Sequence, residues 1–385
     1  MKRRSFVLGA AGALAAQTSR PLRVGLIGHT GHGNYGHGID TVWKAIPEAR
    51  VIAVADPDEQ GREKARLRTG AQRGFADYRQ MLREEKFDIV GVCPRWMDQR
   101  GAMIIAAANA GCHIYSEKAF AATLDEADAM VEAIRRNKVK FQLAHQMRRS
   151  PFTLTVKSML EAGEIGDIQE IRCRGKEDKR AGGEDLMVLG SHLCDVMRML
   201  AGDPQWVFAH VTESGAAISR QNVREGTEPI GPIAGREIGS MFGFAGGLHG
   251  YLASKATKDT HDLRFGTFIY GGKGVIFLPN ANYPNGAQSY ILKSPAWIPG
   301  KGAEWKPIEV EHDHRFDKEA MMTANLGMVE DLLDAIKKDR EPACSERAGL
   351  WTTEMITGIY RSQLSGLPVK FPQNLRKLHP LTVLK

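Results

Sequence analysis

Cysteine is scarce in this chain and has no paired spacing. The five cysteines are scattered and none forms a C-x-x-C pair, so neither a zinc site nor a disulfide framework is expected. We expect most of them to be small buried apolar residues. His312-Asp313-His314 is the nearest approach to a metal pair, but no third ligand is evident, and we predict no metal.

Long apolar runs and aromatic-rich basic clusters are also lacking. No apolar stretch approaches the roughly 20 residues that a membrane span needs, so none is expected. The net charge is +7, but acidic and basic residues are interspersed, which does not favour nucleic-acid binding. At 385 residues the chain is long enough for two domains with their own cores.

The N-terminus carries a twin arginine, Arg3-Arg4, followed by a weakly apolar run to Ala16 that contains Ala13-Leu14-Ala15. This pattern is typical of a twin-arginine signal peptide with an A-x-A cleavage site. We therefore expect residues 1–16 to be a signal and the mature protein to be periplasmic, or otherwise exported by this route. A basic, unstructured N-terminus is the alternative.

The most informative segment is glycine-rich. An apolar run over 22–28 leads into it, and a helix-like segment (Ile39 to Ile46) and a second apolar run ending at Asp56 follow. A dinucleotide needs this order, because glycines let the backbone approach the pyrophosphate and a helix N-terminus offers free N–H groups. Asp56 favours NAD over NADP, since a carboxylate accepts the ribose hydroxyls and repels a 2′-phosphate.

Two registers of the glycine motif remain open. Gly31-x-Gly33-x-x-Gly36 matches the fingerprint literally, whereas Gly28-x-Thr30-x-x-Gly33 begins at the strand end but has threonine in the middle position. We expect a loop one turn longer than usual. The cofactor-binding residues predicted here are Gly28, Thr30, Gly31, His32, Gly33, Asn34, Tyr35 and Asp56.

The remaining pattern predicts an α/β protein of two domains. Residues 20–146 alternate short apolar runs with helical patterns, which indicates a doubly wound parallel sheet, the Rossmann arrangement. The strands are expected at 22–28, 50–55, 88–92, 112–115 and 139–144, with an amphipathic helix from Leu124 to Asn137. A ligand is expected at the carboxyl ends of these strands.

Residues 147–372 are predicted to form a second α/β domain with a large, mostly antiparallel open sheet. Strand-like runs are expected at 168–174, 205–213, 238–255, 263–278, 288–293 and 306–310, with a hairpin turn at Gly271-Gly272-Lys273-Gly274. A helix is expected from Thr153 to Ala162, residues 214–236 as a long loop, and returning helices within 319–362, followed by a tail at 373–385.

At this point the chain resembles the glucose-fructose oxidoreductase / inositol dehydrogenase (Gfo/Idh/MocA) family over nearly all of the mature chain. The matching motifs are the glycine loop with Asp56, Val92-Cys93-Pro94, Gly111 to Lys118, Arg148 to Pro151, Gly163 to Gly166, and Gly190 to Asp195. The resemblance implies a hydride exchanged between a nicotinamide and a hydroxyl-bearing carbon of a sugar, cyclitol or glycoside.

The resemblance also implies roles for individual residues. Lys118 matches the catalytic lysine, His192 shares the alcohol proton with it, and Asp195 binds or orients. Glu117 is placed by the nicotinamide end. Further cofactor contacts are implied at Cys93, Pro94, Arg95, Trp96, Gln99 and Lys118, and substrate contacts at His145, Gln146, Arg148 and His192.

Two positions depart from the family pattern. Ala119 stands where the family has proline after Glu-Lys, and Val188 stands where it often has an acid four residues before the histidine. Glu184 and Asp185 are the nearest candidates to replace that acid at the substrate, although they also suit a helix start.

Four functions stay open. The first is an exported NAD(P)-dependent oxidoreductase acting on a carbohydrate. The second is a redox-neutral glycosidase or lyase that oxidises its sugar transiently, and the third couples the oxidation of one sugar to the reduction of another. The fourth is a non-catalytic, nucleotide-bound binding protein. A homo-oligomer, a dimer or tetramer formed through the open sheet face, is expected from the resemblance, because an open sheet needs cover.

Overall fold

The computed structural model describes residues 20–384 except 259–263, 281–287 and 311–319. The expected signal peptide and His312-Asp313-His314 therefore lie outside the described residues. Within the described part of the chain, no helix is long and apolar enough to cross a bilayer.

The first domain is built on a six-stranded parallel sheet with the order β3-β2-β1-β4-β5-β6. Its strands are β1 (Leu22–Ile27), β2 (Ala49–Ala55), β3 (Arg73–Phe75), β4 (Ile89–Val92), β5 (His113–Ser116) and β6 (Phe141–Leu143). The sheet confirms the predicted Rossmann arrangement. β3 was not predicted because it has three residues, of which Arg73 and Gly74 are exposed.

Helices cover this sheet: α1 (Glu59–Thr69), α2 (Tyr78–Glu84), α3 (Arg100–Asn109) and α4 (Leu124–Arg136). Their ends follow local chemistry. Asp58 caps α1 by accepting the backbone N–H of Gly61, and Gly70 ends it at φ 74°. α4 has acidic residues in its first turn and basic residues in its last turn, which matches the helix dipole.

The helix expected from Ile39 to Ile46 is wrong. Residues 28–41 run as turns, and only a 3₁₀ turn, η1 (Val42–Ala45), follows. Four glycines and one asparagine of this loop adopt positive φ angles, which are not helical, and Pro47 prevents continuation at the other end. Those residues are Gly31, Gly33, Asn34, Gly36 and Gly38. The first turn of α1 instead lies against this loop, with Gly61 packed on the side chain of Thr30.

The second domain contains a ten-stranded sheet with the order β17-β16-β15-β14-β7-β13-β12-β8-β18, and β9 pairs with β8. Neighbouring strands are antiparallel except β7 and β13, as predicted. The strands are β7 (Ile168–Arg174), β8 (Trp206–Glu213), β9 (Ala216–Ala217), β12 (Glu237–Gly243), β13 (His249–Lys255), β14 (Gly266–Gly271), β15 (Gly274–Pro279), β16 (Tyr290–Leu292), β17 (Trp305–Pro307) and β18 (Val369–Lys370). The hairpin predicted at 271–274 joins β14 to β15.

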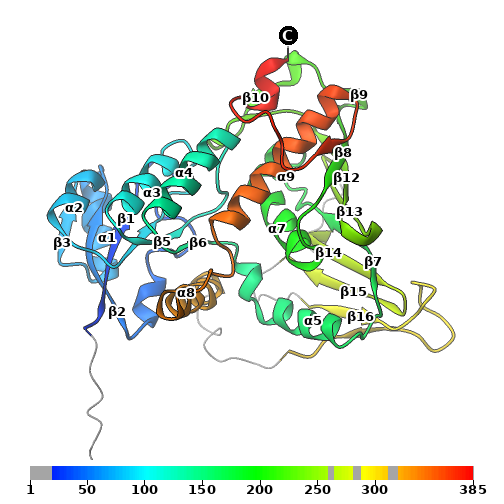
Figure 1. The fold of residues 1–385 in the computed structure, drawn as a ribbon, viewed down its shortest axis with the longest axis horizontal. Helices are drawn as coiled ribbons and strands as arrows, with labels where there is room; N and C mark the ends of the chain where they lie inside the picture. The colour runs from blue at the N-terminus through cyan, green and yellow to red at the C-terminus, as the bar shows by residue number, and fades with distance from the viewer. Residues whose placement is uncertain (1–19, 259–263, 281–287, 311–319, 385) are drawn as a thin grey trace, which may run out of the picture.

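Helices pack on one face of this sheet and also join the two domains. They are η2 (Gln146–Arg149), α5 (Pro151–Glu161), α6 (Gly183–Val188), α7 (Gly190–Ala201), α8 (Ala320–Lys338) and α9 (Glu346–Ser365). α9 contacts α4 of the first domain and both β8 and α7 of the second, and α8 lies below the junction (Figure 1). The end of the chain thus ties the domains together.

The segment 214–236 was expected as a long loop. It contains short pieces only: β9, a 3₁₀ turn at Arg220–Asn222, and the two-residue strands β10 (Arg224–Glu225) and β11 (Pro232–Ile233), which pair with each other. Between β10 and β11 the backbone N–H of Met97 donates to the carbonyl of Pro229 at 3.3 Å. The segment therefore reaches across to the first domain.

Candidate active site

Lys118 lies at the carboxyl end of β5, as the sequence predicts for the catalytic lysine. Its side chain is 8% exposed, and Nζ donates to the carbonyl of Val188 at 2.8 Å. Burial lowers the pKa of Lys118, while the charge of Glu117 raises it. The Lys118–Ala119 peptide bond is cis. The amine is thus held at the domain junction with its proton easier to lose than that of a free lysine.

His192, on α7, lies close to this lysine. It is 8% exposed, and burial lowers its pKa well below the ordinary value, with further lowering from His145 and Lys118. Its Nδ1 has no hydrogen-bond partner among the described residues. The ring of the fully buried His145 lies 4.9 Å away between centroids. A neutral imidazole with an unused nitrogen suits hydrogen bonding to a substrate hydroxyl.

Asp195 lies one turn further along α7 and is fully buried. Arg148 donates to both of its oxygens, from Nε at 2.8 Å and from Nη2 at 2.7 Å. Arg148 and His145 hold the pKa of Asp195 well below its usual range, although burial alone would raise it. His145 Nδ1 is 3.7 Å from the same carboxylate. Of the two roles predicted for Asp195, this geometry favours orienting its neighbours.

Glu117 is also fully buried, at the end of β5. One oxygen accepts hydrogen bonds from the backbone N–H and the Nδ1 of His37, at 2.9 and 2.6 Å, and the other accepts the N–H of Lys118 at 2.8 Å. Burial alone would raise the pKa of Glu117, but His37, Lys118 and Arg100 bring it to about 2. Glu117 therefore links the glycine loop to Lys118.

Glu117 gives a prediction for acid stability. Because its folded pKa of about 2 lies below the usual 4.3 or so, the ionised form stabilises the fold above pH 4.3, and this contribution fades as the pH falls towards 2. The difference in unfolding free energy between wild type and Glu117→Gln should therefore shrink from pH 6 to pH 3 in urea titrations. Exposed Glu132→Gln is the control, and a difference constant with pH would contradict the assignment.

Asn325 of α8 joins the same network. Its Nδ2 donates to the carbonyl of His37 at 2.6 Å, and its Oδ1 accepts from the Tyr115 hydroxyl and, at 3.2 Å, from Gln146. Gln146, predicted to contact substrate, is thus 6% exposed and bonded to α8. A residue near the end of the chain therefore fixes the glycine loop.

Arg100, at the start of α3, hydrogen-bonds to the backbone of Lys118. It is 1% exposed, and Nη1 donates to the carbonyls of Pro94 at 3.1 Å, Arg95 at 2.9 Å and Lys118 at 3.1 Å. Its Nε and Nη2 have no partner among the described residues. Burial lowers the pKa of Arg100 to about 10. One buried cation thus holds the loops after β4 and β5 together.

The glycines of the first loop are explained largely by the chain's own contacts. A Cβ on Gly28 would lie 2.2 Å from the ring of Tyr35, one on Gly33 2.6 Å from the N of Trp96, and one on Gly36 2.6 Å from Glu117. A Cβ on Gly31, at φ 80°, would meet nothing within 4 Å. At Gly28, Gly33 and Gly36 the atoms that approach the backbone closely belong to other residues of this protein, whereas Gly31 has open space beside it.

The rest of this loop packs on the loop after β4. His29 Nδ1 lies 3.1 Å from Gln99 Oε1, and His32 Nε2 lies 2.8 Å from Asp98. The rings of His32 and Trp96 meet edge to face at 4.4 Å. Asn34 accepts the N–H of Gly31. The structure thus brings together the predicted cofactor residues of both loops, except that Cys93 is fully buried with its thiol towards the Gly91 carbonyl.

A cavity at the carboxyl ends of β1 and β2 fits the adenosine end of a dinucleotide. Its volume is about 230 Å³, and it is lined by Ile27, Gly28, His29, Ala55, Asp56, Pro57, Ala76, Asp77, Tyr78, Arg79, Gln99 and Met103. Asp56 is fully buried and accepts from the N–H and, at 2.7 Å, the hydroxyl of Thr30. The glycine, the carboxylate and the open strand ends are the parts a dinucleotide requires.

Glu184 and Asp185, the two acids predicted near the substrate, are bonded within the second domain. Oδ2 of Asp185 accepts from the Ser254 hydroxyl at 2.6 Å and the N–H of Glu177 at 3.2 Å, and burial raises its pKa. Its Oδ1 has no hydrogen-bond partner among the described residues. One oxygen of Glu184 accepts the N–H of Thr227 at 3.0 Å and its hydroxyl. Within the described residues neither acid forms a hydrogen bond or ion pair with Lys118 or His192, so their role at the substrate stays a prediction.

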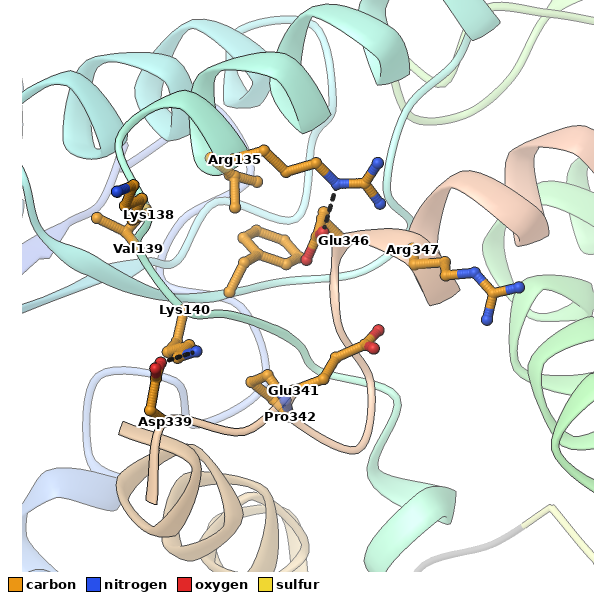
Figure 2. A pocket seen from close by; sticks show the side chains of 11 residues that line it. Arg135, Lys138, Val139, Lys140, Asp339, Glu341, Pro342, Glu346 and Arg347 are labelled. Carbon is orange, nitrogen blue, oxygen red and sulfur yellow. Dashed lines mark hydrogen bonds and ion pairs between the residues drawn. The ribbon is translucent and has the colours of Figure 1, made fainter. Parts of the chain in front are cut away.

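A larger cavity, of about 480 Å³, lies at the opposite edge of the first sheet, beside the start of β6. Its charged side chains pair with one another: Arg135 with Glu346 at 3.0 Å and Lys140 with Asp339 at 2.6 Å (Figure 2). Ligands of open α/β sheets bind at the carboxyl ends of the strands, so this cavity is not the cofactor site.

Sequence reasoning missed His37, Arg100 and Asn325 as site residues. His37 lies at the end of the glycine-rich segment, and nothing in its sequence neighbours points to Glu117. Arg100 did leave a signal, because it opens the otherwise apolar segment Ala102–Ala108. An arginine that begins a buried helix needs acceptors, and the loops after β4 and β5 supply them.

Comparison with known proteins agrees with this geometry. Residues 22–145 match the model of an oxidoreductase family with an NAD-binding Rossmann fold, and residues 153–277 match the Gfo/Idh/MocA C-terminal domain. The NAD-binding description agrees with the expectation from Asp56.

Several curated relatives are sugar dehydrogenases. Levoglucosan dehydrogenase of Pseudarthrobacter phenanthrenivorans is 30% identical over 259 residues, 60% of this chain and 65% of that protein. D-apiose dehydrogenase of Paraburkholderia graminis is 30% identical over 201 residues, 50% and 52% of the two chains. The chain thus matches between about half and two thirds of the length of these relatives.

Solved structures share the whole fold. Levoglucosan dehydrogenase in complex with NADH and levoglucosan superposes with a TM-score of 0.72 at 20% identity, over 92% of this chain and all of that one. An NAD-binding oxidoreductase from Klebsiella pneumoniae gives 0.73 at 20% identity, over the same shares. With both domain models matched in order, the chain belongs to the Gfo/Idh/MocA family of NAD-binding oxidoreductases.

Proposed function

We propose that this protein is an exported NAD-dependent dehydrogenase that oxidises a hydroxyl of a sugar, cyclitol or glycoside. The observation that carries the proposal is the pairing of Lys118 and His192 at the domain junction, both nearly buried and both with a lowered pKa. The names of the relatives, dehydrogenases of levoglucosan and apiose, support the substrate class.

The residues of this chain would have separate roles in the proposed oxidation. Lys118, oriented by the Val188 carbonyl, would take the proton of the reacting hydroxyl, since burial makes its amine easier to deprotonate. His192 would hold the same hydroxyl through its unused nitrogen. Arg148 and Asp195 would keep the histidines in place. Gly28, Asp56 and the loops after β1 and β4 would hold the cofactor, which would supply the hydride acceptor.

The test is an assay of the mature chain with NAD or NADP and a panel of anhydrosugars, pentoses and inositols. Formation of NADH with at least one of them supports the dehydrogenase, and none with any of them removes it. Denaturing the protein as purified and identifying any released nucleotide by chromatography accompanies the assay. One NAD per chain with product but no net NADH would favour the redox-neutral mechanism or paired sugar oxidation and reduction.

Export and assembly complete the proposal. The twin arginine at Arg3-Arg4 motivates export, and processing of the signal in an export-competent host followed by cell fractionation would test it.

The outer face of the second sheet carries a row of side chains that lie opposite one another on neighbouring strands. They are Phe208, Met241, Tyr251, Arg172, Phe268, Phe277 and Tyr290. Such an apolar face suits a second copy of this chain, and a monomer in analytical ultracentrifugation would contradict it.

A further inference from the structure

The loop between β10 and β11 crosses the domain junction at Glu228. On one side Thr227 donates its N–H to Glu184 at 3.0 Å, and on the other the N–H of Met97 donates to the carbonyl of Pro229 at 3.3 Å. Arg95 of the first domain lies 3.9 Å from the Glu228 carboxylate. The loop is therefore anchored to both domains beside Arg95, a residue expected to contact the cofactor.

Glu228 faces cations that converge from separate segments. Besides Arg95, its charge raises the pKa of Lys118, of Arg100 and of Arg180. No side chain of its own loop supplies these charges.

The carboxylate of Glu228 has free acceptor capacity. By contrast, both oxygens of Glu117, the acid next to Lys118, accept hydrogen bonds. Within the described residues Glu228 makes only the 3.9 Å ion pair, which is longer than a hydrogen bond, and its side chain is 18% exposed. A partly open carboxylate with unused lone pairs can accept hydrogen bonds from vicinal hydroxyls of a sugar.

We propose that Glu228 is an acidic residue of the substrate site, which faces Lys118 at the domain junction and accepts hydrogen bonds from hydroxyls of the carbohydrate. It thereby supplies, from the loop, the acid that Val188 does not provide. This inference rests on the proposed function for its substrate class. The charged and titratable groups around Lys118 are Glu117, Arg100, Arg180, His192 and Glu228.

The experiment compares Glu228→Gln with Glu225→Gln, which removes an exposed acid from β10, next to the loop. Glu228→Gln should raise the KM for the sugar about 10- to 100-fold, because hydrogen bonds to a charged acceptor are lost, with NAD affinity unchanged. The acetylation of Lys118 by acetic anhydride is followed by peptide mass spectrometry over a series of pH values. The pH midpoint of this acetylation should be lower in Glu228→Gln than in the wild type, since a neighbouring negative charge is gone. Glu225→Gln should change neither quantity.

Two outcomes would overturn the assignment. One is a sugar KM and a Lys118 labelling midpoint that both stay at wild-type values in Glu228→Gln. The other is an equal loss in Glu225→Gln, which would indicate a general effect of the loop. If the wild type oxidises no sugar, the proposed function fails, but the labelling midpoints still report whether Glu228 faces Lys118.

Discussion

Lys118→Ala is expected to lower turnover by about 10²- to 10⁴-fold while NAD still binds. The amine is the group placed to take the substrate proton, and general acid–base groups contribute rate factors of that size. Most of the proposed nucleotide contacts lie elsewhere, at Gly28, Asp56 and the loop after β4. Steady-state kinetics with the best sugar, together with NAD titration by intrinsic fluorescence, would measure both quantities.

The pH profile adds a second readout for the same residue. If Lys118 must be neutral to accept the proton, oxidation rises with pH, and its midpoint lies below the roughly 10.4 of an ordinary lysine because burial lowers the pKa. Lys118→Arg should be as slow as the alanine variant, since a guanidinium does not lose its proton. Lys157→Ala, an exposed lysine on α5, is the control. Unchanged turnover in Lys118→Ala would remove the proposed role.

The local sequence pattern was sufficient to predict those strands and turns whose structure is determined by their own residues. The alternation of apolar runs and amphipathic segments predicts five of the six Rossmann strands, and the Gly271–Gly274 turn predicts its hairpin because glycine tolerates the turn. Lys118 and His192 could be placed together only through the family motifs. Nothing in residues 112–118 indicates by itself that α7 will approach.

Contacts between distant segments account for what sequence reasoning missed. Asn325 hydrogen-bonds to His37, which lies 288 residues earlier in the sequence, and Glu117 accepts two hydrogen bonds from His37, which lies 80 residues earlier. Such pairs leave no periodic signal. The helix expected from Ile39 to Ile46 failed for a local reason, because Gly38 at positive φ and Pro47 enclose a segment that forms only a 3₁₀ turn.

The two acids expected at the substrate show the same limit. Glu184 and Asp185 were chosen because they stand near Val188 in sequence, yet one oxygen of Glu184 bonds to Thr227, and one oxygen of Asp185 bonds to Ser254 and the N–H of Glu177. The charge of Glu228, some 40 residues further along, acts on Lys118 because its loop crosses the junction. Sequence proximity to Val188 does not indicate Glu228, because its loop is brought to the junction by the fold.

Asp195→Asn is expected to lower the free energy of unfolding by about 3–5 kcal/mol. The change leaves Arg148, 12% exposed, without its anionic partner, and an uncompensated buried charge costs about that much. The folded pKa of Asp195 lies well below the usual value, so its stabilisation is present above about pH 3.9 and is lost as the pH falls further. Urea denaturation at pH 7 and pH 3 would measure both effects.

The double variant Arg148→Met/Asp195→Leu separates charge from packing. If the penalty of Asp195→Asn comes from the orphaned guanidinium, removing both charges should recover most of it, because a buried ion pair contributes little beyond an apolar pair of similar size. Glu161→Gln, which breaks the exposed pair with Lys157, should change stability by less than about 1 kcal/mol. A double variant as unstable as Asp195→Asn would mean that Asp195 acts mainly through His145 and Cys344, which lie 3.7 Å from its oxygens.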